Sequence, residues 1–212
     1  MRRAPPPLPE IPLSFGPAPE RATHPLLLSS GEPIVPARTR VALAANAEGL
    51  TVLFEADADP PLEVRRSRPQ DPVYEDECVE LFWEGDEPDG RYTEIVVNPL
   101  GTVYSARIDN PDGDRRTWKV SPIPLEGLEI RVSGSPGAAP GAWERWTCAL
   151  RVPWSTLAPG RPTPIPGSVH RGNLFRIARG GVSRFEALSP TLRSPPDFHV
   201  PARFVRFNFL GL

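Results

Sequence analysis

The sequence contains no long apolar run, so no part of it has the length of a membrane-spanning helix. It begins Met1-Arg2-Arg3, but prolines interrupt the residues that follow, and Leu26-Leu27-Leu28 is too short to serve as the apolar core of a secretory signal. On these grounds the sequence as given predicts a cytoplasmic protein.

Sulfur and imidazole side chains are scarce as well. There are two cysteines, Cys78 and Cys148, in different strand phases, and three scattered histidines, His24, His170 and His199. Such small numbers exclude a disulfide framework for a chain of 212 residues, and the spacing argues against a structural zinc site. We therefore expect two buried, reduced thiols.

An excess of charge of one sign is also missing. The formal net charge of −2 gives no overall field, so we expect neither a nucleic acid nor a membrane surface as partner. Asp57 and Asp59 precede two prolines, where such a pair either ligates calcium or forms a turn. The sequence leaves the oligomeric state open.

Proline, by contrast, is abundant, and ten of the 30 prolines fall within residues 1–36. Proline has no backbone donor and holds extended conformations. Residues 1–36 are therefore predicted to form an arm that either lies on the domain or is a loose tail. Residues 37–212 are predicted to form one domain, which is large enough to bury a core without disulfides.

Apolar and acidic residues alternate over 74–83 (YEDECVELFW), which predicts a β-strand. Successive side chains of a strand point to opposite faces. Val79, Leu81 and Trp83 are therefore expected to enter a core, whereas Glu80 stands on the other face as a carboxylate on a rigid sheet.

Similar patterns recur along the chain between turns rich in glycine and proline. They predict further strands over 39–46, 50–56, 92–98, 101–108, 128–132, 143–152, 174–179 and 202–210, and a single helical turn over 153–157. No long amphipathic helix is evident. The pattern is typical of an all-β fold, a sandwich of two antiparallel sheets with roughly ten strands.

Flat aromatic and planar polar side chains are distributed over these strands and loops. Proteins bind a sugar ring through an aromatic face against its C–H surface and through polar groups on its hydroxyls. The candidates are Tyr74, Tyr104 and Trp118 as rings, and Glu80, Glu94, Arg107 and Arg179 as polar groups. Alternatives stay open: the glutamates as solvated strand residues, Trp118 as a seal on the core, and Arg179 as an ion-pair partner of either glutamate.

Five segments in a fixed order carry a resemblance to a known family. They are DECVELF at 76–82, YTEIVVNPLG at 92–101, LRVPWSTL at 150–157, a strand ending at Arg179, and LSPT at 188–191 followed by PDFHVPARF at 196–204. In this order and spacing the chain resembles, over about residues 37–212, the family 9 carbohydrate-binding modules and their looser relatives among the DOMON-like β-sandwiches.

The resemblance implies a jelly-roll or DOMON-like sandwich that holds a mono- or oligosaccharide between two aromatic rings, with a carboxylate on its hydroxyls. Tyr74 matches the first ring and Glu80 the carboxylate. The second ring belongs where this chain has Leu188, and Phe185 is the available substitute. The position of a family arginine holds Val96 instead.

Because of that departure, Arg107 or Arg179 would have to supply the missing donor. Family members also carry structural calcium, for which the sequence shows no acidic cluster here. We expect no other cofactor.

The sequence thus predicts a non-catalytic, stand-alone carbohydrate-binding protein. Three other functions stay open. Glu80 and Glu94 on adjacent strands could form the carboxylate pair of a glycoside-acting enzyme. The leucine at position 188 favours an interaction or structural sandwich that has lost its sugar site. A haem protein of this fold would need methionine and histidine ligands, but Met1 is the single methionine.

Overall fold

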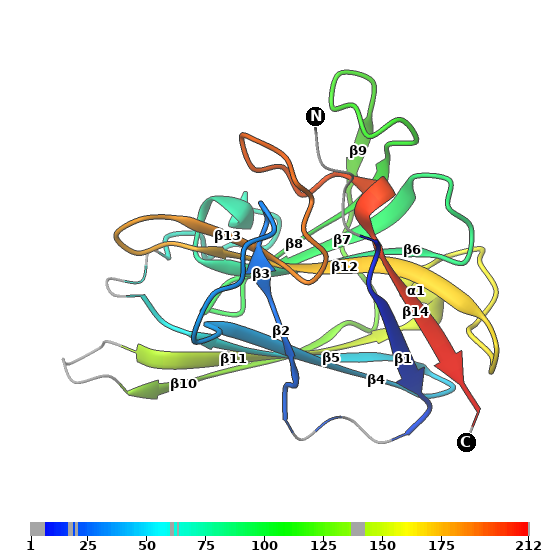
Figure 1. Ribbon diagram of the computed structural model, residues 1–212, viewed down its shortest axis with the longest axis horizontal. Coiled ribbons are helices and arrows are strands. Elements are labelled where there is room, and N and C mark those ends of the chain that lie inside the picture. Colours follow the sequence, from blue (N-terminus) through cyan, green and yellow to red (C-terminus); the bar gives the residue numbers. More distant parts are fainter. Residues whose placement is uncertain are drawn as a thin grey trace.

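The protein folds into two β-sheets stacked face to face, as the computed structural model in Figure 1 shows. The structure describes residues 7–16, 19, 21–59, 62, 64–136 and 143–211, except for the side chains of 135 and 136. Within this part of the chain, one short α-helix and two 3-10 turns accompany the strands. The predicted all-β sandwich is confirmed.

The larger sheet has nine strands. Seven of them form a continuous path in the order β1 (Glu10–Ser14), β14 (Val205–Leu210), β12 (Val169–Ala178), β6 (Cys78–Gly85), β7 (Arg91–Val97), β8 (Val103–Asp109) and β9 (Lys119–Pro122). The other two are β13 (Arg184–Ala187), which pairs with β12, and β3 (Leu27–Leu28), which pairs with β13. Neighbouring strands are antiparallel except β1 and β14, which run parallel.

The smaller sheet has five strands, and all its pairings are antiparallel. Their order is β10 (Glu129–Pro136), β11 (Trp143–Pro153), β5 (Gly49–Asp57), β4 (Thr39–Ala45) and β2 (His24–Pro25). The helical elements are η1 (Val73–Glu75), α1 (Trp154–Leu157) and η2 (Pro201–Arg203).

Most strands lie where the alternation of the sequence predicts them. The predicted segments 39–46 and 50–56 form the hairpin β4–β5, and α1 is the single helical turn expected after β11. The strand prediction over 74–83 was wrong at its start, because residues 73–75 form η1 and β6 begins at Cys78. Asp76 ends this turn by accepting backbone N–H groups of the loop before it, at 3.0 and 2.8 Å.

The short strands β1, β2, β3, β9 and β13 are absent from the sequence-based assignment. β2 and β3 have only two residues each, and β1 lies in the proline-rich segment that the sequence predicts to be an arm. Three of them come from the proline-rich segment 1–36, whose described part therefore contributes to both sheets. The predicted boundary between this arm and the sandwich stays a prediction.

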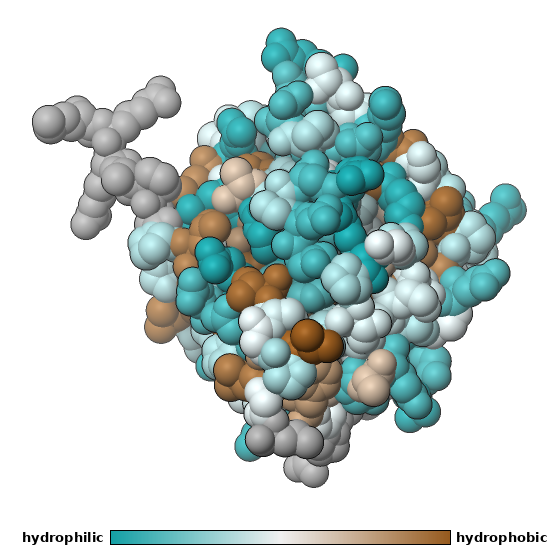
Figure 2. Space-filling view, turned by 90° about the vertical axis from the view of Figure 1, so that its right-hand side faces the viewer, coloured by the Kyte–Doolittle hydropathy of each residue, from teal (hydrophilic) through white to brown (hydrophobic). Residues whose placement is uncertain are grey.

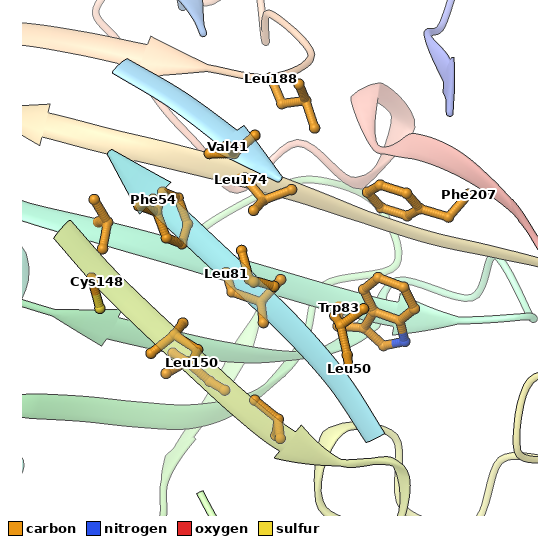
Figure 3. Close-up of a cluster of buried hydrophobic side chains, with 14 of the residues drawn as sticks. Val41, Leu50, Phe54, Leu81, Trp83, Cys148, Leu150, Leu174, Leu188 and Phe207 are labelled. Atoms are coloured by element: carbon orange, nitrogen blue, oxygen red, sulfur yellow. The ribbon is translucent and has the colours of Figure 1, made fainter. Parts of the chain in front are cut away.

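The main core lies between the sheets, and Figure 3 shows its side chains converging from both of them. Leu81 and Trp83 of β6 enter it as predicted and are almost fully buried. They meet Phe54 and Leu150 of the smaller sheet. Cys148 is part of the same cluster, and both cysteines are free and buried, as the sequence predicts.

A second apolar cluster covers the outer face of the larger sheet. It contains Phe82 and Phe175, which point outward from the sheet, together with Phe198 from the loop before η2 and Phe204, which directly follows η2. Phe175 and Phe198 stack with ring centroids 4.2 Å apart. Because the loops pack onto this face, the larger sheet is buried on both sides around β6.

The two sheets are joined by an enclosed ion pair. The side chains of Arg176 on β12 and Glu77 are fully buried, with 2.7 Å between Nη2 and Oε1. Arg176 also donates to Thr39 Oγ1 at 2.9 Å and to the Asp57 carbonyl at 2.6 Å, both in the smaller sheet. Trp146 of that sheet donates to Glu77 at 3.1 Å. The pair thus has partners on both sides of the sandwich.

Each of the four strands that end the two sheet paths contains a proline. These are Pro12 in β1, Pro122 in β9, Pro136 in β10 and Pro25 in β2. Proline lacks the N–H that a central strand must donate, so edge strands are where a sheet tolerates it.

Large hydrophobic side chains that remain exposed, such as Val35, Leu100 and Val182, come from separate loops. On the face seen in Figure 2, hydrophobic residues likewise form separate patches among hydrophilic ones. Among the described residues, no helix has the length and apolar character needed to cross a membrane.

We expect Arg176→Met to lower the free energy of unfolding by roughly 3–5 kcal/mol, because it leaves the Glu77 carboxylate buried without its counter-charge. Urea denaturation followed by circular dichroism measures the change. Arg116→Met is the matched control: Arg116 pairs with Asp114 but its side chain is 88% exposed, so the urea midpoint should barely move. Similar midpoints for both variants would contradict the role given to Arg176.

Candidate functional site

Two carboxyl groups lie side by side on the outer face of the larger sheet. Glu80 comes from β6 and Glu94 from β7, and the register pairs Glu80 with Val96 and Phe82 with Glu94. The two glutamates are therefore diagonal neighbours on one face, as period-two alternation in adjacent strands requires. Glu80 is 2% exposed and Glu94 4% exposed. We call these two residues the carboxyl pair.

A pocket of about 310 Å³ opens over the carboxyl pair. Its walls come from η1, from strands β8, β9 and β13, from the C-terminal end of β12, and from the loops that precede β9 and follow β13. Besides the carboxyl pair, the lining residues are Tyr74, Tyr104, Arg115, Trp118, Val120, Ile177, Arg179, Phe185, Pro196, Asp197, Phe198 and His199. A rigid sheet thus forms the floor, and separate chain segments supply the walls.

Aromatic rings dominate these walls. Tyr74 and Tyr104 meet edge to face with centroids 5.3 Å apart. The rings of Trp118 and His199 meet edge to face, with centroids 4.6 Å apart. The guanidinium carbon of Arg115 lies 5.1 Å from the centroid of the Trp118 ring. Tyr74 is 42% exposed, so its ring remains open to a ligand at the pocket rim.

Arginines hold the rim of the pocket. Arg115 donates to Asp197 Oδ1 at 2.7 Å. Arg179 donates to Ser183 Oγ at 3.0 Å, and its guanidinium lies 5.6 Å from the centroid of Phe185. Both cations therefore have partners at the rim, which leaves the floor to the carboxyl pair.

His199 is held rigidly beside the floor. Its Nδ1 lies 2.8 Å from the Tyr92 hydroxyl, and its carbonyl accepts a hydrogen bond from Asn110 at 3.2 Å. Burial lowers the pKa of His199 to about 3, so the imidazole is neutral near pH 7. Its Nε2 is 3.9 Å from Glu94 Oε1, too far for a hydrogen bond.

Burial dominates the electrostatics of the floor. It raises the pKa of Glu94 to about 8, against the opposing effect of Arg115. Burial also raises the pKa of Glu80 well above its usual range, and the nearby Glu94 carboxylate adds to this shift. Burial therefore favours the protonated form of both carboxyl groups.

The structure brings together seven of the eight residues singled out in the sequence. They are Tyr74, Glu80, Glu94, Tyr104, Trp118, Arg179 and Phe185. The alternative left open for Arg179, an ion pair with Glu80 or Glu94, is not formed; its guanidinium instead donates to Ser183.

Arg107 does not reach this pocket. It lies opposite Thr93 on the other face of the sheet and donates to the carbonyl of Thr156 at 2.5 Å and of Leu157 at 3.3 Å. The side chain thus binds the end of α1 and lines a separate cleft of about 510 Å³. Arg107 is three residues from Tyr104 in one strand, so the two must point to opposite faces.

Leu188 is also remote from the pocket. It is 7% exposed and belongs to the core between the sheets, where Figure 3 shows it near Leu174. The aromatic side chains that line the pocket include Trp118 and Phe185.

Sequence reasoning missed Arg115, Asp197 and His199 as site residues. The last two lie in the PDFHVPARF segment, where only the resemblance drew attention to them, and Arg115 follows a turn at 110–114. Loops have no periodicity from which side-chain direction can be read, so residue pattern alone gave no signal for their place in the pocket.

No group of acidic, histidine or cysteine side chains within the described residues is arranged to hold a metal ion. Asp57 and Asp59, the pair considered for calcium, instead form ion pairs with arginines: Asp59 with Arg38 at 2.6 Å and with Arg184 at 2.5 Å, and Asp57 with Arg145 at 3.1 Å.

The structure thus combines a two-sheet sandwich with a ring-lined pocket over two buried carboxyl groups. Comparison with known families gives the class of protein: the sequence model of Carbohydrate-binding family 9 matches residues 36–209. The chain belongs to this family.

Solved structures share the fold. A protein of proposed carbohydrate-binding function from Bacteroides uniformis superimposes with a TM-score of 0.69 at 18% identity, covering 94% of this chain and 97% of that one. A family 9 module from Caldicellulosiruptor kristjanssonii in complex with cellotriose gives 0.58 at 14% identity, with 96% and 94% covered. The same kind of module in complex with glucose gives 0.55 at 14% identity, with 96% of each chain covered. No protein of curated function matches the sequence.

The raised pKa of Glu94 makes stability depend on pH. Between its ordinary value of 4.5 and about 8, the unfolded chain ionises this carboxyl while the folded protein keeps it protonated. The folded state therefore binds more protons at this site, and the contribution of Glu94 to the free energy of unfolding should fall as pH rises through this window and level off above it.

Thermal unfolding at pH 5, 6, 7 and 8 measures this slope. Relative to the wild type, Glu94→Gln should make the slope less negative, although Glu80 still contributes, whereas Glu129→Gln, whose side chain is 61% exposed, should leave it unchanged. Equal slopes in the wild type and the Glu94 variant would show that folding does not raise the pKa of this carboxyl.

Proposed function

We propose that the protein is a non-catalytic carbohydrate-binding protein that holds a mono- or oligosaccharide in the pocket over the carboxyl pair, Glu80 and Glu94. The observation that carries this proposal is the combination, in one pocket of about 310 Å³, of aromatic walls with a floor of two buried carboxyl groups. Family membership supports it, as do the solved relatives in complex with cellotriose and glucose.

Each part of the pocket has a role that follows from its chemistry. The indole of Trp118 and the phenol of Tyr74 offer flat faces to the C–H surface of a pyranose. Glu80 and Glu94 offer oxygens to vicinal hydroxyls, and Arg179 offers donors at the rim. Because the floor belongs to a sheet buried on both sides, the ligand meets polar groups that are already oriented.

Calorimetric titration with glucose and with cellotriose tests the proposal. Trp118→Ala should weaken binding roughly tenfold through loss of a stacking surface. Glu80→Gln should weaken it by a similar factor or more, because a buried acceptor becomes an amide with a different donor pattern. Trp143→Ala, in β11 of the other sheet, is the control and should leave affinity unchanged.

The two arginines provide a sharper comparison. Arg179 lines the pocket and Arg107 lines the separate cleft, so Arg179→Ala should weaken sugar binding and Arg107→Ala should not. Circular dichroism establishes that both variants are folded. Binding that depends on Arg107 and not on Arg179 would place the sugar in the other cleft.

The same preparations distinguish binding from cleavage. A glycoside-acting enzyme needs one carboxyl as acid and the other as ionised base or nucleophile. The raised pKa values of both carboxyls disfavour that division. Prolonged incubation with cellotriose should therefore release no glucose, and release that Glu94→Gln abolishes would establish an enzyme instead.

A further inference from the structure

The carboxyl pair is poorly satisfied by the protein itself. In the described part of the chain, the nearest donor to Glu80 is the Cys78 thiol, with Sγ 3.8 Å from Oε1. For Glu94 it is the neutral His199 ring at 3.9 Å, and no hydrogen bond to its carboxylate is formed by the residues that the structure describes. Two buried acceptors therefore face the pocket with almost no donors.

Two other buried carboxylates near this part of the sheet, unlike the carboxyl pair, have an arginine partner. Glu77 has Arg176 at 2.7 Å. Glu84, on the same face of β6 as Glu80, has Arg171 at 3.0 Å and the backbone N–H of Gly90 at 2.7 Å. Glu77 and Glu84 thus each have an arginine as a partner. Glu80 and Glu94 have no cationic partner in the described part of the chain, and the pocket lies where such a partner would be.

The arginines around the pocket do not pair with Glu80 or Glu94. Arg115 is paired with Asp197 at 2.7 Å, and Arg179 donates to Ser183 at 3.0 Å. The three acids and two arginines of the lining sum to a net charge of +1 while both glutamates are protonated, and to −1 once both are ionised. A ligand with one positive charge would neutralise the ionised pocket, and its three N–H donors would match the free oxygens.

We propose that the sugar recognised by this pocket is an amino sugar, a pyranose whose ammonium group lies between the carboxylates of Glu80 and Glu94. This inference rests on the proposed function and specifies its ligand. The aromatic walls would take the C–H face of the ring, as for any pyranose. Binding would displace the protons that the carboxyl pair retains in the empty pocket, since a cation favours the ionised form of both acids.

The titratable groups around the pair, in addition to the two glutamates, are Tyr74, Cys78, Tyr104, Arg115, Arg179, Asp197 and His199. Burial raises the pKa of Cys78 and of Tyr104, the latter to about 12, and lowers that of His199 to about 3. The pKa of Asp197 is lowered by Arg115 despite burial. Among these shifts, that of Glu94 brings its pKa to about 8, and that of Glu80 has the same direction.

Calorimetric titration at pH 6 with glucosamine, glucose and N-acetylglucosamine tests the inference. Glucosamine should bind at least about tenfold more tightly than glucose, because its ammonium makes hydrogen bonds between charged groups. N-acetylglucosamine carries a neutral amide at the same position and should not share this gain. Repeating the titrations in two buffers of different ionisation enthalpy should show proton release with glucosamine and none with glucose.

Glu94→Gln removes one charge and keeps the shape of the side chain. In this variant the affinity for glucosamine should be within about threefold of the affinity for glucose. Glucose should still bind, because Glu80 is unchanged. If this variant does not fold, the wild-type selectivity and the proton release still decide the question. Binding of glucose with equal or greater affinity than glucosamine would overturn the amino-sugar inference and leave the proposed function intact. Failure of these three sugars and of cellotriose to bind would overturn both.

Discussion

The site depends on one constraint, which is that the central strand β6 is buried on both of its faces. Each residue from Cys78 to Gly85 is buried. Leu81 and Trp83 fill the core between the sheets, so the alternate residue Glu80 must point outward, where a second apolar layer covers it. A carboxyl group held in this way cannot relax towards solvent. Its raised pKa and its fixed direction have the same cause.

The floor of the pocket could be predicted from the sequence, whereas its walls could be predicted only in part. Alternation fixes the direction of Glu80 and Glu94, because a strand leaves each side chain only two choices. The same rule, applied to β8, places Arg107 on the face opposite to Tyr104. The prediction that both residues belong to one site therefore contradicted the alternation of this strand. Arg115 and His199 lie in loops, where direction is set by long-range packing that a local pattern does not encode.

The ion pair of Arg176 and Glu77 bears on the expectation of structural calcium. Its guanidinium lies among a carboxylate, a hydroxyl and backbone carbonyls contributed by both sheets. Oxygen groups of this kind are also the ligands of hard cations. Here a covalently attached cation occupies such a position, so no metal is needed there to neutralise the buried acid. Substituting the arginine would expose how far the two sheets depend on that charge.

The prolines at the four sheet edges have a consequence for how molecules of this protein meet one another. An edge strand normally presents a row of free N–H and C=O groups to which a strand from another molecule can add. Pro12, Pro25, Pro122 and Pro136 each interrupt that row. Fibrous growth by strand addition is thereby disfavoured at the ends of both sheet paths.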